Sequence, residues 1–284
     1  MSNTVRGAVR PGWLRVRAPV GGRIEEVNAV LEQQHLRTVC CEARCPNLGE
    51  CWIAGRATIL ILGSACTRAC SYCSVEKRTP SPPDPGEPER VALAAAELAW
   101  RHIVVTSVTR DDLHDGGAAQ FARLVEAVRL RVPVATVELL IPDLSGDPDA
   151  LRIVVESRPD VLGHNIETVP RLYPIVRPQA DYCRSIGLLA GARSMDPGLT
   201  LKSGLMAGFG ETYGEIVAVM EDLFSVGCRS ITIGQYLPPT PSHPPVDRYL
   251  TGEEFAELAS EAHRIGYQRV ASGPLVRSSY KAKA

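Results

Sequence analysis

Three cysteines in one short stretch could bind most of an iron–sulfur cluster. Cys66, Cys70 and Cys73 follow a C-x3-C-x2-C pattern. Three thiolates on one loop can bind three irons of a cubane 4Fe-4S cluster, in which each iron usually takes one cysteine. The fourth iron would then stay open to a chelating ligand, such as the amino and carboxylate groups of a methionine-like molecule. The spacing therefore predicts a cluster with an open coordination site.

A second group of cysteines lies just upstream. Cys40, Cys45 and Cys51 follow a C-x4-C-x5-C pattern and again offer three thiolates, so a fourth ligand must come from elsewhere in the chain. Zinc is the main alternative metal. Zinc sites usually offer two C-x2-C pairs or a Cys/His equivalent, whereas here only Cys70 and Cys73 form such a pair. The pattern favours two iron–sulfur clusters.

Composition limits the compartment and the partners. The chain has 284 residues, 45% of them hydrophobic, with a formal net charge of -1, so it has no general attraction to nucleic acid or to an anionic membrane. Nine cysteines without a secretory signal indicate metal binding in a reducing compartment. We expect a soluble, cytoplasmic protein. Cys183 and Cys228 stand alone in apparently helical stretches, and we expect both to be buried.

The first 24 residues are basic. They contain five arginines and no acidic residue, which resembles a transit peptide, but Pro11 and Pro19 would interrupt an amphipathic helix. We expect instead a basic arm packed on the domain. The arginines are Arg6, Arg10, Arg15, Arg17 and Arg23.

Short apolar runs alternate with helical patterns from residue 57 onward, which is typical of parallel βα units. Helical spacing recurs around Phe121 and around Ile216, and Thr251 to Glu254 forms a capping box that opens a further helix. The predicted fold is α/β, a partial (β/α)6 TIM-like barrel. The six expected strands cover residues 57–63, 103–108, 136–141, 161–165, 202–206 and 230–236.

Three segments make up the predicted organisation. Residues 1–56 form an extension that carries the upstream cysteines, residues 57–270 form the barrel, and residues 271–284 form a tail that closes its mouth. Two proline-rich stretches, 79–88 and 238–245, are expected to be loops.

Polar residues occur in or at the ends of successive expected strands, mostly toward the carboxyl end where barrel enzymes place their chemistry. One polar residue at a strand end could simply mark where the strand stops. Five such groups on successive strands favour one shared site. These groups are Thr106-Ser107, Glu138, His164-Asn165-Glu167, Lys202 and Gln235-Tyr236.

The motifs around the cysteines resemble the lipoyl synthase family of the radical S-adenosylmethionine (SAM) superfamily, over roughly residues 35–283. The resemblance rests on five segments, which are 38–52, 106–117, 164–173, 201–206 and 277–280, the last reading Arg-Ser-Ser-Tyr.

The resemblance implies SAM and two 4Fe-4S clusters as cofactors. In the family, the cluster of the C-x3-C-x2-C loop cleaves SAM to a 5'-deoxyadenosyl radical. The radical removes hydrogens from C6 and C8 of a protein-bound octanoyl-lysine, and an auxiliary cluster supplies the two sulfur atoms and is consumed. The family also implies that Ser279 is the fourth auxiliary ligand; serine oxygen is a harder and weaker iron ligand than thiolate, which suits a cluster that is dismantled.

The resemblance also suggests residues near SAM. Tyr72 stands where the family has an aromatic near the adenine, although a packed tyrosine is an equal alternative. Charge and strand-end position make six further residues candidates to hold SAM, and a salt bridge with Glu138 or Glu167 is the alternative role for Lys202. The six are Thr106, Ser107, Asn165, Glu167, Arg193 and Lys202.

Some positions depart from the family pattern. Cys41 stands where an acidic residue is usual and could replace Cys40 as a ligand, although the spacing favours Cys40. Ser64 and Ser74 replace common aspartates, and prolines stiffen the loop around His243. These differences bear on the substrate loops more than on the clusters.

Two other functions compete with this reading. A methylthiotransferase shares the two-cluster arrangement but usually carries a basic RNA-binding domain, which the near-neutral charge does not favour. An iron–sulfur sensor or a zinc module would not need polar residues at several strand ends.

The implied partners are octanoylated carrier domains, either of the acyltransferase subunits of 2-oxoacid dehydrogenases or of the glycine cleavage system. An electron donor such as ferredoxin or flavodoxin and an iron–sulfur cluster carrier are also expected, and neither nucleic acid nor a membrane is. The arginines of the basic arm could steer an acidic carrier.

Overall fold

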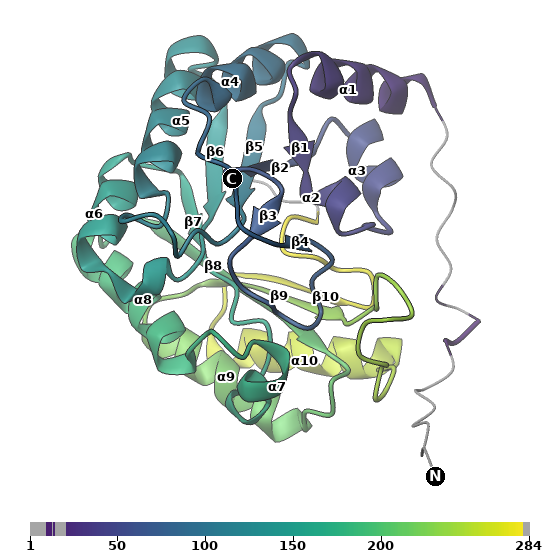
Figure 1. Cartoon of the computed structure of the whole chain (residues 1–284). Helices are drawn as coiled ribbons and strands as arrows, with labels where there is room; N and C mark the ends of the chain where they lie inside the picture. Colours follow the sequence, from purple (N-terminus) through teal and green to yellow (C-terminus); the bar gives the residue numbers. More distant parts are fainter. Residues whose placement is uncertain (1–9, 13, 15–20, 281–284) are drawn as a thin grey trace.

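The computed structural model of the chain describes residues 10–12, 14 and 21–280 (Figure 1). Its main sheet has the strand order β1-β2-β5-β6-β7-β8-β9-β10. All neighbours from β2 to β10 pair in parallel, and only the short β1 (Arg37–Thr38) is antiparallel to its neighbour within the described sheet. The parallel strands are β2 (Thr58–Ile61), β5 (His102–Ser107), β6 (Thr136–Leu140), β7 (Val161–Gly163), β8 (Thr200–Ala207), β9 (Ser230–Gln235) and β10 (Arg269–Gly273).

The six predicted strands are confirmed, and the prediction missed a seventh parallel strand. Strand β10 pairs with β9 from Arg269 to Gly273. Its sequence, Arg-Val-Ala-Ser-Gly, has no apolar run because β10 ends the sheet and is only half-buried. The predicted boundary at residue 270 falls inside this strand. The sheet does not close between β1 and β10, which confirms a partial barrel.

Helices cover the outside of the sheet, as Figure 1 shows. The predicted helices around Phe121, Ile216 and Phe255 are confirmed, and the capping box of Thr251 with Glu254 is present. The helices that connect the parallel strands are α4 (Glu87–Glu97), α5 (Ala118–Arg131), α6 (Pro148–Glu156), α8 (Tyr182–Met195), α9 (Tyr213–Ser225) and α10 (Gly252–Ile265). Short η1 (Leu144–Gly146), η2 (Pro170–Leu172) and α7 (Tyr173–Val176) lie between them.

The N-terminal extension packs beside the open edge of the sheet. It consists of α1 (Gly22–Gln33), α2 (Val39–Glu42) and α3 (Leu48–Ile53), with α2 against β2. The predicted basic arm is mostly beyond the described residues, since Arg6, Arg15 and Arg17 lie outside them. The two-residue strands β3 (Ala65–Cys66) and β4 (Glu76–Lys77) flank the cysteine loop.

The proline-rich stretches and the lone cysteines match the predictions only in part. The stretch 238–245 is a loop as predicted, but Pro88 lies in the first turn of α4, where proline is tolerated because that N–H has no helical partner. Cys228 is buried as predicted but precedes β9 outside any helix, whereas Cys183 is exposed on α8, so that prediction was wrong. No helix among the described residues is long and apolar enough to cross a membrane.

Candidate functional site

The cysteine loop follows β2 and lies over the carboxyl ends of the parallel strands. Cys66 ends β3, and the loop is held from the far side of the barrel, since Ser71 N–H donates to the Val176 carbonyl at 2.9 Å and Ala69 N–H donates to Gln179 Oε1 at 2.6 Å. Burial, together with the nearby Cys70 and Cys66, raises the pKa of the Cys73 thiol to about 11. The three thiols are therefore close enough to affect one another.

The upstream cysteines line one cavity together with the C-terminal tail. Cys40, Cys45, Cys51 and Ser279 all face this cavity, whereas Cys41 points to solvent. Burial raises the pKa of Cys51 to about 12, with Cys40 and Cys45 adding to the shift. The structure thus brings together the ligand set that the sequence suggested and favours Cys40 over Cys41.

The tail is tied to the barrel and to the extension. Asn47 Nδ2 donates to the Leu275 carbonyl at 2.6 Å, and Thr58 Oγ1 donates to Ser279 Oγ at 2.6 Å. Above β9, a Cβ added at Gly234 would lie 2.2 Å from the Val276 carbonyl oxygen, so only glycine lets the tail pass this close.

A group of mostly half-buried polar side chains lies between the two sets of cysteines. Asn165 Nδ2 donates to Glu167 Oε1 at 3.1 Å and also contacts Ser278 Oγ. Burial raises the pKa of Glu167, while Arg177, Asn165 and Tyr72 stabilise its charged form. Glu167 has a φ of 67°, a costly backbone conformation for this residue type, and a bridge to Leu205 of β8 holds it there.

Two arginines belong to this group and were missed as site residues. Burial lowers the pKa of Arg277, and the nearby Cys45 and Glu167 oppose that effect, so Arg277, which lines the cavity of the upstream cysteines, also lies near Glu167. Arg177 donates to the Asn165 and Ile166 carbonyls at 3.1 and 3.2 Å, and its buried Nε has no hydrogen-bond partner among the described residues. Arg277 is the first residue of the 277–280 motif and Arg177 lies just after the 164–173 segment, but nothing in their local sequence pattern shows that they turn inward.

The aromatic candidate, Tyr72, lies close to other aromatic side chains. The Tyr72 ring is 6.5 Å from that of Phe209, which stacks on Tyr236 at 4.0 Å. At the end of β5, Thr106 Oγ1 donates to the Leu140 carbonyl at 2.7 Å, and Ser107 Oγ is buried without a partner among the described residues. Tyr72, Thr106 and Ser107 therefore lie at the carboxyl ends of the strands.

Lys202 forms an ion pair with Glu138, which was the alternative to a contact with SAM. Its Nζ lies 2.6 Å from Glu138 Oε1, and His102 Nε2 lies 3.3 Å from Glu138 Oε2. In the sheet register, Lys202 is opposite Gly163, the last residue of β7, and opposite Ser230, the first residue of β9. Glu138 is the middle residue of β6. The ion pair therefore lies along the strands rather than at their carboxyl ends, and a contact of Lys202 with SAM stays a prediction.

Arg193 is not brought to the mouth. It lies in the last turn of α8, and its guanidinium donates to the carbonyls of Pro197 and Gly227. The cavity that it lines also contains Thr200, at the start of β8. Because the helix returns toward the amino end of the sheet before β8 begins, its last turn lies opposite the carboxyl end.

The donor atoms fit iron–sulfur clusters. Each cysteine set offers soft sulfur donors, which suit iron–sulfur clusters. Among the described residues no three His, Cys, Asp or Glu side chains are grouped as ligands of a single ion. A cubane needs no such grouping, because each of its thiolates binds a different iron and the sulfur atoms stay further apart.

Known proteins similar to this chain agree with the geometry. The Radical SAM superfamily model matches residues 60–223. Lipoyl synthase of Chloroflexus aurantiacus is 52% identical over 281 residues, covering 99% of this chain and 92% of the relative. Lipoyl synthase of Rubrobacter xylanophilus is 51% identical, covering 96% of this chain and 85% of the relative, and that of Caldanaerobacter subterraneus is 50% identical, covering 96% and 95%.

Solved structures support the fold. Methylornithine synthase superposes with a TM-score of 0.60 at 14% identity, covering 87% of this chain and 77% of that one. Coproporphyrinogen III oxidase from Escherichia coli, a radical SAM enzyme, gives a TM-score of 0.53 at 14% identity, covering 74% and 52%. The sequence relationship, the two cysteine sets and the tail serine together show that this chain belongs to the lipoyl synthase family of the radical SAM superfamily.

Proposed function

We propose that this lipoyl synthase inserts sulfur at C6 and C8 of an octanoyl group that is amide-linked to a lysine of a carrier domain. The family uses SAM and two 4Fe-4S clusters, and the chain has a cysteine set for each. When bound, the loop cluster and SAM supply a 5'-deoxyadenosyl radical, which is needed because acid–base groups cannot remove protons from unactivated carbons.

The observation that carries the proposal is that two consecutive residues of the tail contact the two sites. Ser278 contacts Asn165, in the polar group beside Tyr72 and Cys70, while Ser279 bonds Thr58 in the cavity of the upstream cysteines. One short segment therefore joins the radical-generating side to the sulfur-donating side. A substrate carbon could meet both without leaving the barrel.

The residues at the mouth have roles that match their chemistry. Glu167 and Asn165 would accept hydrogen bonds from the amino group of SAM, and the positive charge of Arg177 would suit its carboxylate. Tyr72 and Phe209 offer aromatic surfaces for the adenine. Burial of these groups excludes water, which protects a carbon radical from side reactions.

Cys40, Cys45, Cys51 and Ser279 would hold the auxiliary cluster. The Ser279 hydroxyl accepts a hydrogen bond from Thr58, which orients its oxygen into the cavity. Because oxygen is the weakest iron ligand of this set, Ser279 is the ligand that leaves most easily when sulfur is removed.

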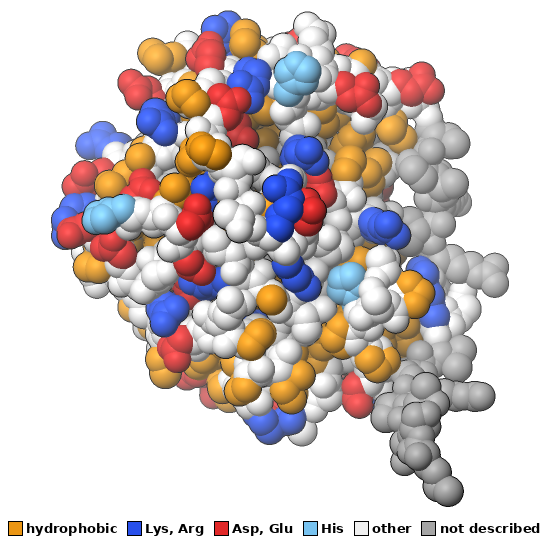
Figure 2. Space-filling view, in the orientation of Figure 1, with side chains coloured by type: hydrophobic (Ala, Val, Ile, Leu, Met, Phe, Trp, Pro, Cys, Tyr) orange, Lys and Arg blue, Asp and Glu red, His pale blue; other side chains and the backbone are white. Residues whose placement is uncertain are grey.

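The partners follow from the substrate. Octanoylated carrier domains of 2-oxoacid dehydrogenase acyltransferases or of the glycine cleavage system would deliver the substrate. Figure 2 shows Lys and Arg side chains near the middle of the face on which β4 lies in Figure 1, which suits an acidic carrier. Ferredoxin or flavodoxin would supply electrons, a cluster carrier would rebuild the auxiliary cluster, and the reactions would take place in the cytoplasm without nucleic acid or membrane.

The test uses anaerobically prepared protein in which only the clusters contain ³⁴S. It is mixed with an octanoylated carrier domain, SAM and a reductant, and the products are analysed by mass spectrometry. The proposal predicts a lipoylated carrier that contains ³⁴S, with about two 5'-deoxyadenosines formed per lipoyl group because each carbon needs one radical. Sulfur drawn from the medium in the first turnover would contradict the role of the auxiliary cluster.

A further inference from the structure

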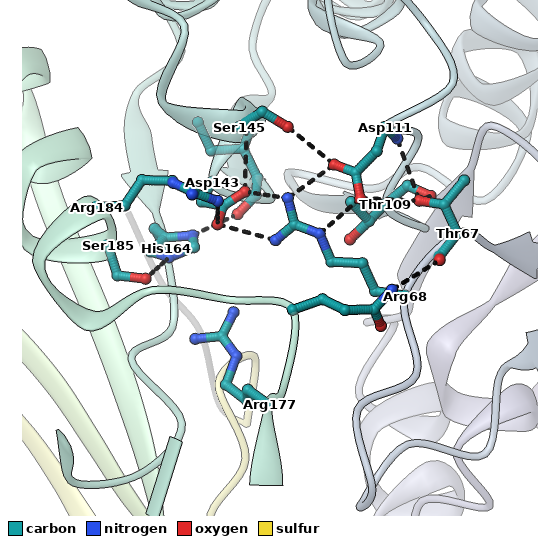
Figure 3. Close-up of polar contacts among 12 residues, drawn as sticks. Thr67, Arg68, Thr109, Asp111, Asp143, Ser145, His164, Arg177, Arg184 and Ser185 are labelled. Atoms are coloured by element: carbon teal, nitrogen blue, oxygen red, sulfur yellow. Dashed lines mark hydrogen bonds and ion pairs between the residues drawn. The ribbon is translucent and has the colours of Figure 1, made fainter. Parts of the chain in front are cut away.

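Arg68 lies inside the cysteine loop, yet its side chain points into the protein. Its side chain is 5% exposed, although the residue stands between Cys66 and Cys70. Figure 3 shows the guanidinium directed between Asp111 and Asp143. An arginine buried this deeply needs a full set of partners, because desolvating an unpaired charge is costly.

The guanidinium has such a set. Arg68 Nε and Nη2 bond the two oxygens of Asp111 at 2.7 Å each, in a bidentate pair. On its other side, Nη1 lies 2.9 Å from Asp143 Oδ2 and Nη2 lies 2.7 Å from Asp143 Oδ1. Bidentate pairs fix orientation as well as distance, so these contacts hold the Arg68 guanidinium in one orientation.

The two carboxylates are themselves fixed. Asp143 is fully buried, accepts from Ser145 N–H at 3.1 Å and is approached by Arg184 at 3.4 Å. Asp111 accepts from Ser145 Oγ at 2.9 Å. Arg68 keeps the pKa of both aspartates below the usual value, so they are charged at neutral pH. The formal charges of Arg68, Arg184, Asp111 and Asp143 then sum to zero.

The same network reaches the first cysteine of the loop. Cys66 Sγ accepts from the N–H of Arg68 and from the N–H of Thr109, both at 3.4 Å. Thr67 holds these two donors in register, because its N–H donates to the Thr109 carbonyl at 3.1 Å and its hydroxyl accepts from Asp111 N–H at 3.1 Å. The Arg68 side chain thus anchors the backbone whose amides point at this sulfur.

Hydrogen bonds to the sulfur ligands of an iron–sulfur cluster favour the reduced, more negative state and so raise the reduction potential. We propose that Arg68 is a positioning residue, which, through Asp111 and Asp143, aims the Arg68 and Thr109 amides at Cys66 and so makes the cluster of this loop easier to reduce. Reduction of that cluster must precede cleavage of SAM.

The test is Arg68→Lys, which keeps the positive charge but removes the bidentate contacts with Asp111 and Asp143. The potential of the loop cluster is measured by EPR-monitored redox titration in chains whose Cys40, Cys45 and Cys51 are alanine, so that only this cluster gives a signal. We expect full iron content and a shift to a more negative potential. The matched control is Arg184→Lys, which alters an arginine on the same Asp143 without touching the cysteine loop, and it should leave the potential unchanged.

An unchanged potential in Arg68→Lys at equal iron content would overturn the proposal, as would an equal shift in Arg184→Lys. If Arg68→Lys fails to bind iron, Asp111→Glu is measured instead. This variant keeps the negative charge but displaces the carboxylate that binds the Arg68 guanidinium by one methylene. We expect Asp111→Glu also to shift the potential to a more negative value, and an unchanged potential in this variant would equally refute the role of Arg68.

The inference rests on the proposed function, because it assumes a cluster on Cys66, Cys70 and Cys73. The presence of the cluster and the role of Arg68 can be refuted separately. Absence of iron from the unmutated loop would refute the cluster, whereas bound iron with an unshifted potential in the variant would refute only the part played by Arg68.

Discussion

Thr58 and Ser279 are 221 positions apart, and their hydroxyl oxygens lie 2.6 Å from each other. Thr58 begins β2, the first parallel strand of the sheet, and Ser279 belongs to the tail beyond the last one. This contact places the tail serine in the cavity of the upstream cysteines. The auxiliary site therefore forms only when both ends of the described chain are folded onto the barrel.

Replacing Ser279 tests its role as a weak ligand. Ser279→Cys should keep the iron of the auxiliary site but slow sulfur insertion ~10-fold, the effect of about 1.4 kcal/mol in the barrier, because a thiolate leaves iron less readily. Iron analysis and single-turnover assays would check this. Ser279→Ala, which offers no ligand, should lose iron instead. An unchanged rate in the cysteine variant would show that release of this ligand does not limit the reaction.

Gly234 tests the path of the tail. Gly234→Ala places a methyl group against the Val276 carbonyl and should push Ser279 away from the auxiliary cavity. We expect most of the auxiliary iron to be lost while the loop cluster is retained, as measured by iron analysis and EPR. Gly214→Ala is the matched control, because a Cβ there has no neighbour within 4 Å. Equal iron in both variants would contradict this path.

The Lys202–Glu138 ion pair decides between two roles for Lys202. Lys202→Met should cost about 3–5 kcal/mol in the free energy of unfolding, because it leaves Glu138 buried without its cation. Adding Glu138→Leu should recover most of that loss, as measured by urea unfolding. If Lys202 is purely structural, the double variant binds SAM with normal affinity in equilibrium dialysis. A large loss of affinity would support Lys202 as a SAM contact.

His164 makes stability depend on pH. Burial, helped by Arg177, lowers the pKa of His164 to about 4 from 6.5, while its bond to the Ile141 carbonyl opposes the shift. Because the unfolded chain then binds more protons between these values, this stability is present above pH 6.5 and is lost as pH falls to about 4. The loss should be roughly 3 kcal/mol, at 1.36 kcal/mol per pKa unit.

The check is urea unfolding at several pH values between 7 and 4. His164→Asn, which keeps an N–H donor for the Ile141 carbonyl but does not titrate, should show a flatter dependence of unfolding free energy on pH. Parallel curves for the two proteins would mean that His164 does not produce the dependence.

Much of the fold was predictable because the central strands are buried on both faces and read as apolar runs. Ile59, Ile61, Ile103 and Val105 are completely buried, and their strands were found. Strand β10 was missed because it lies at the edge of the sheet, where half-burial places no demand for an apolar run.

The cluster ligands were predictable for a different reason. Cysteine spacing is local, so Cys66, Cys70 and Cys73 could be grouped from the sequence alone, and the relation of Ser279 to the upstream set came from the family motif. The partners of charged residues are not local. The sequence offered the pairing of Lys202 with Glu138 only as an alternative to Glu167 and to SAM, and strand-end position did not decide among them. The bonds of Arg193 to the carbonyls of Pro197 and Gly227 do not follow from strand-end position either.

Iron and acid-labile sulfide per chain test the central claim most directly. Anaerobically prepared protein should contain about eight irons, and the Cys66→Ala/Cys70→Ala/Cys73→Ala variant should contain about four, because two independent 4Fe-4S clusters are present. About four irons falling to nearly none would mean a single cluster. That result would leave the upstream cysteines without iron and would contradict an auxiliary cluster as the source of sulfur.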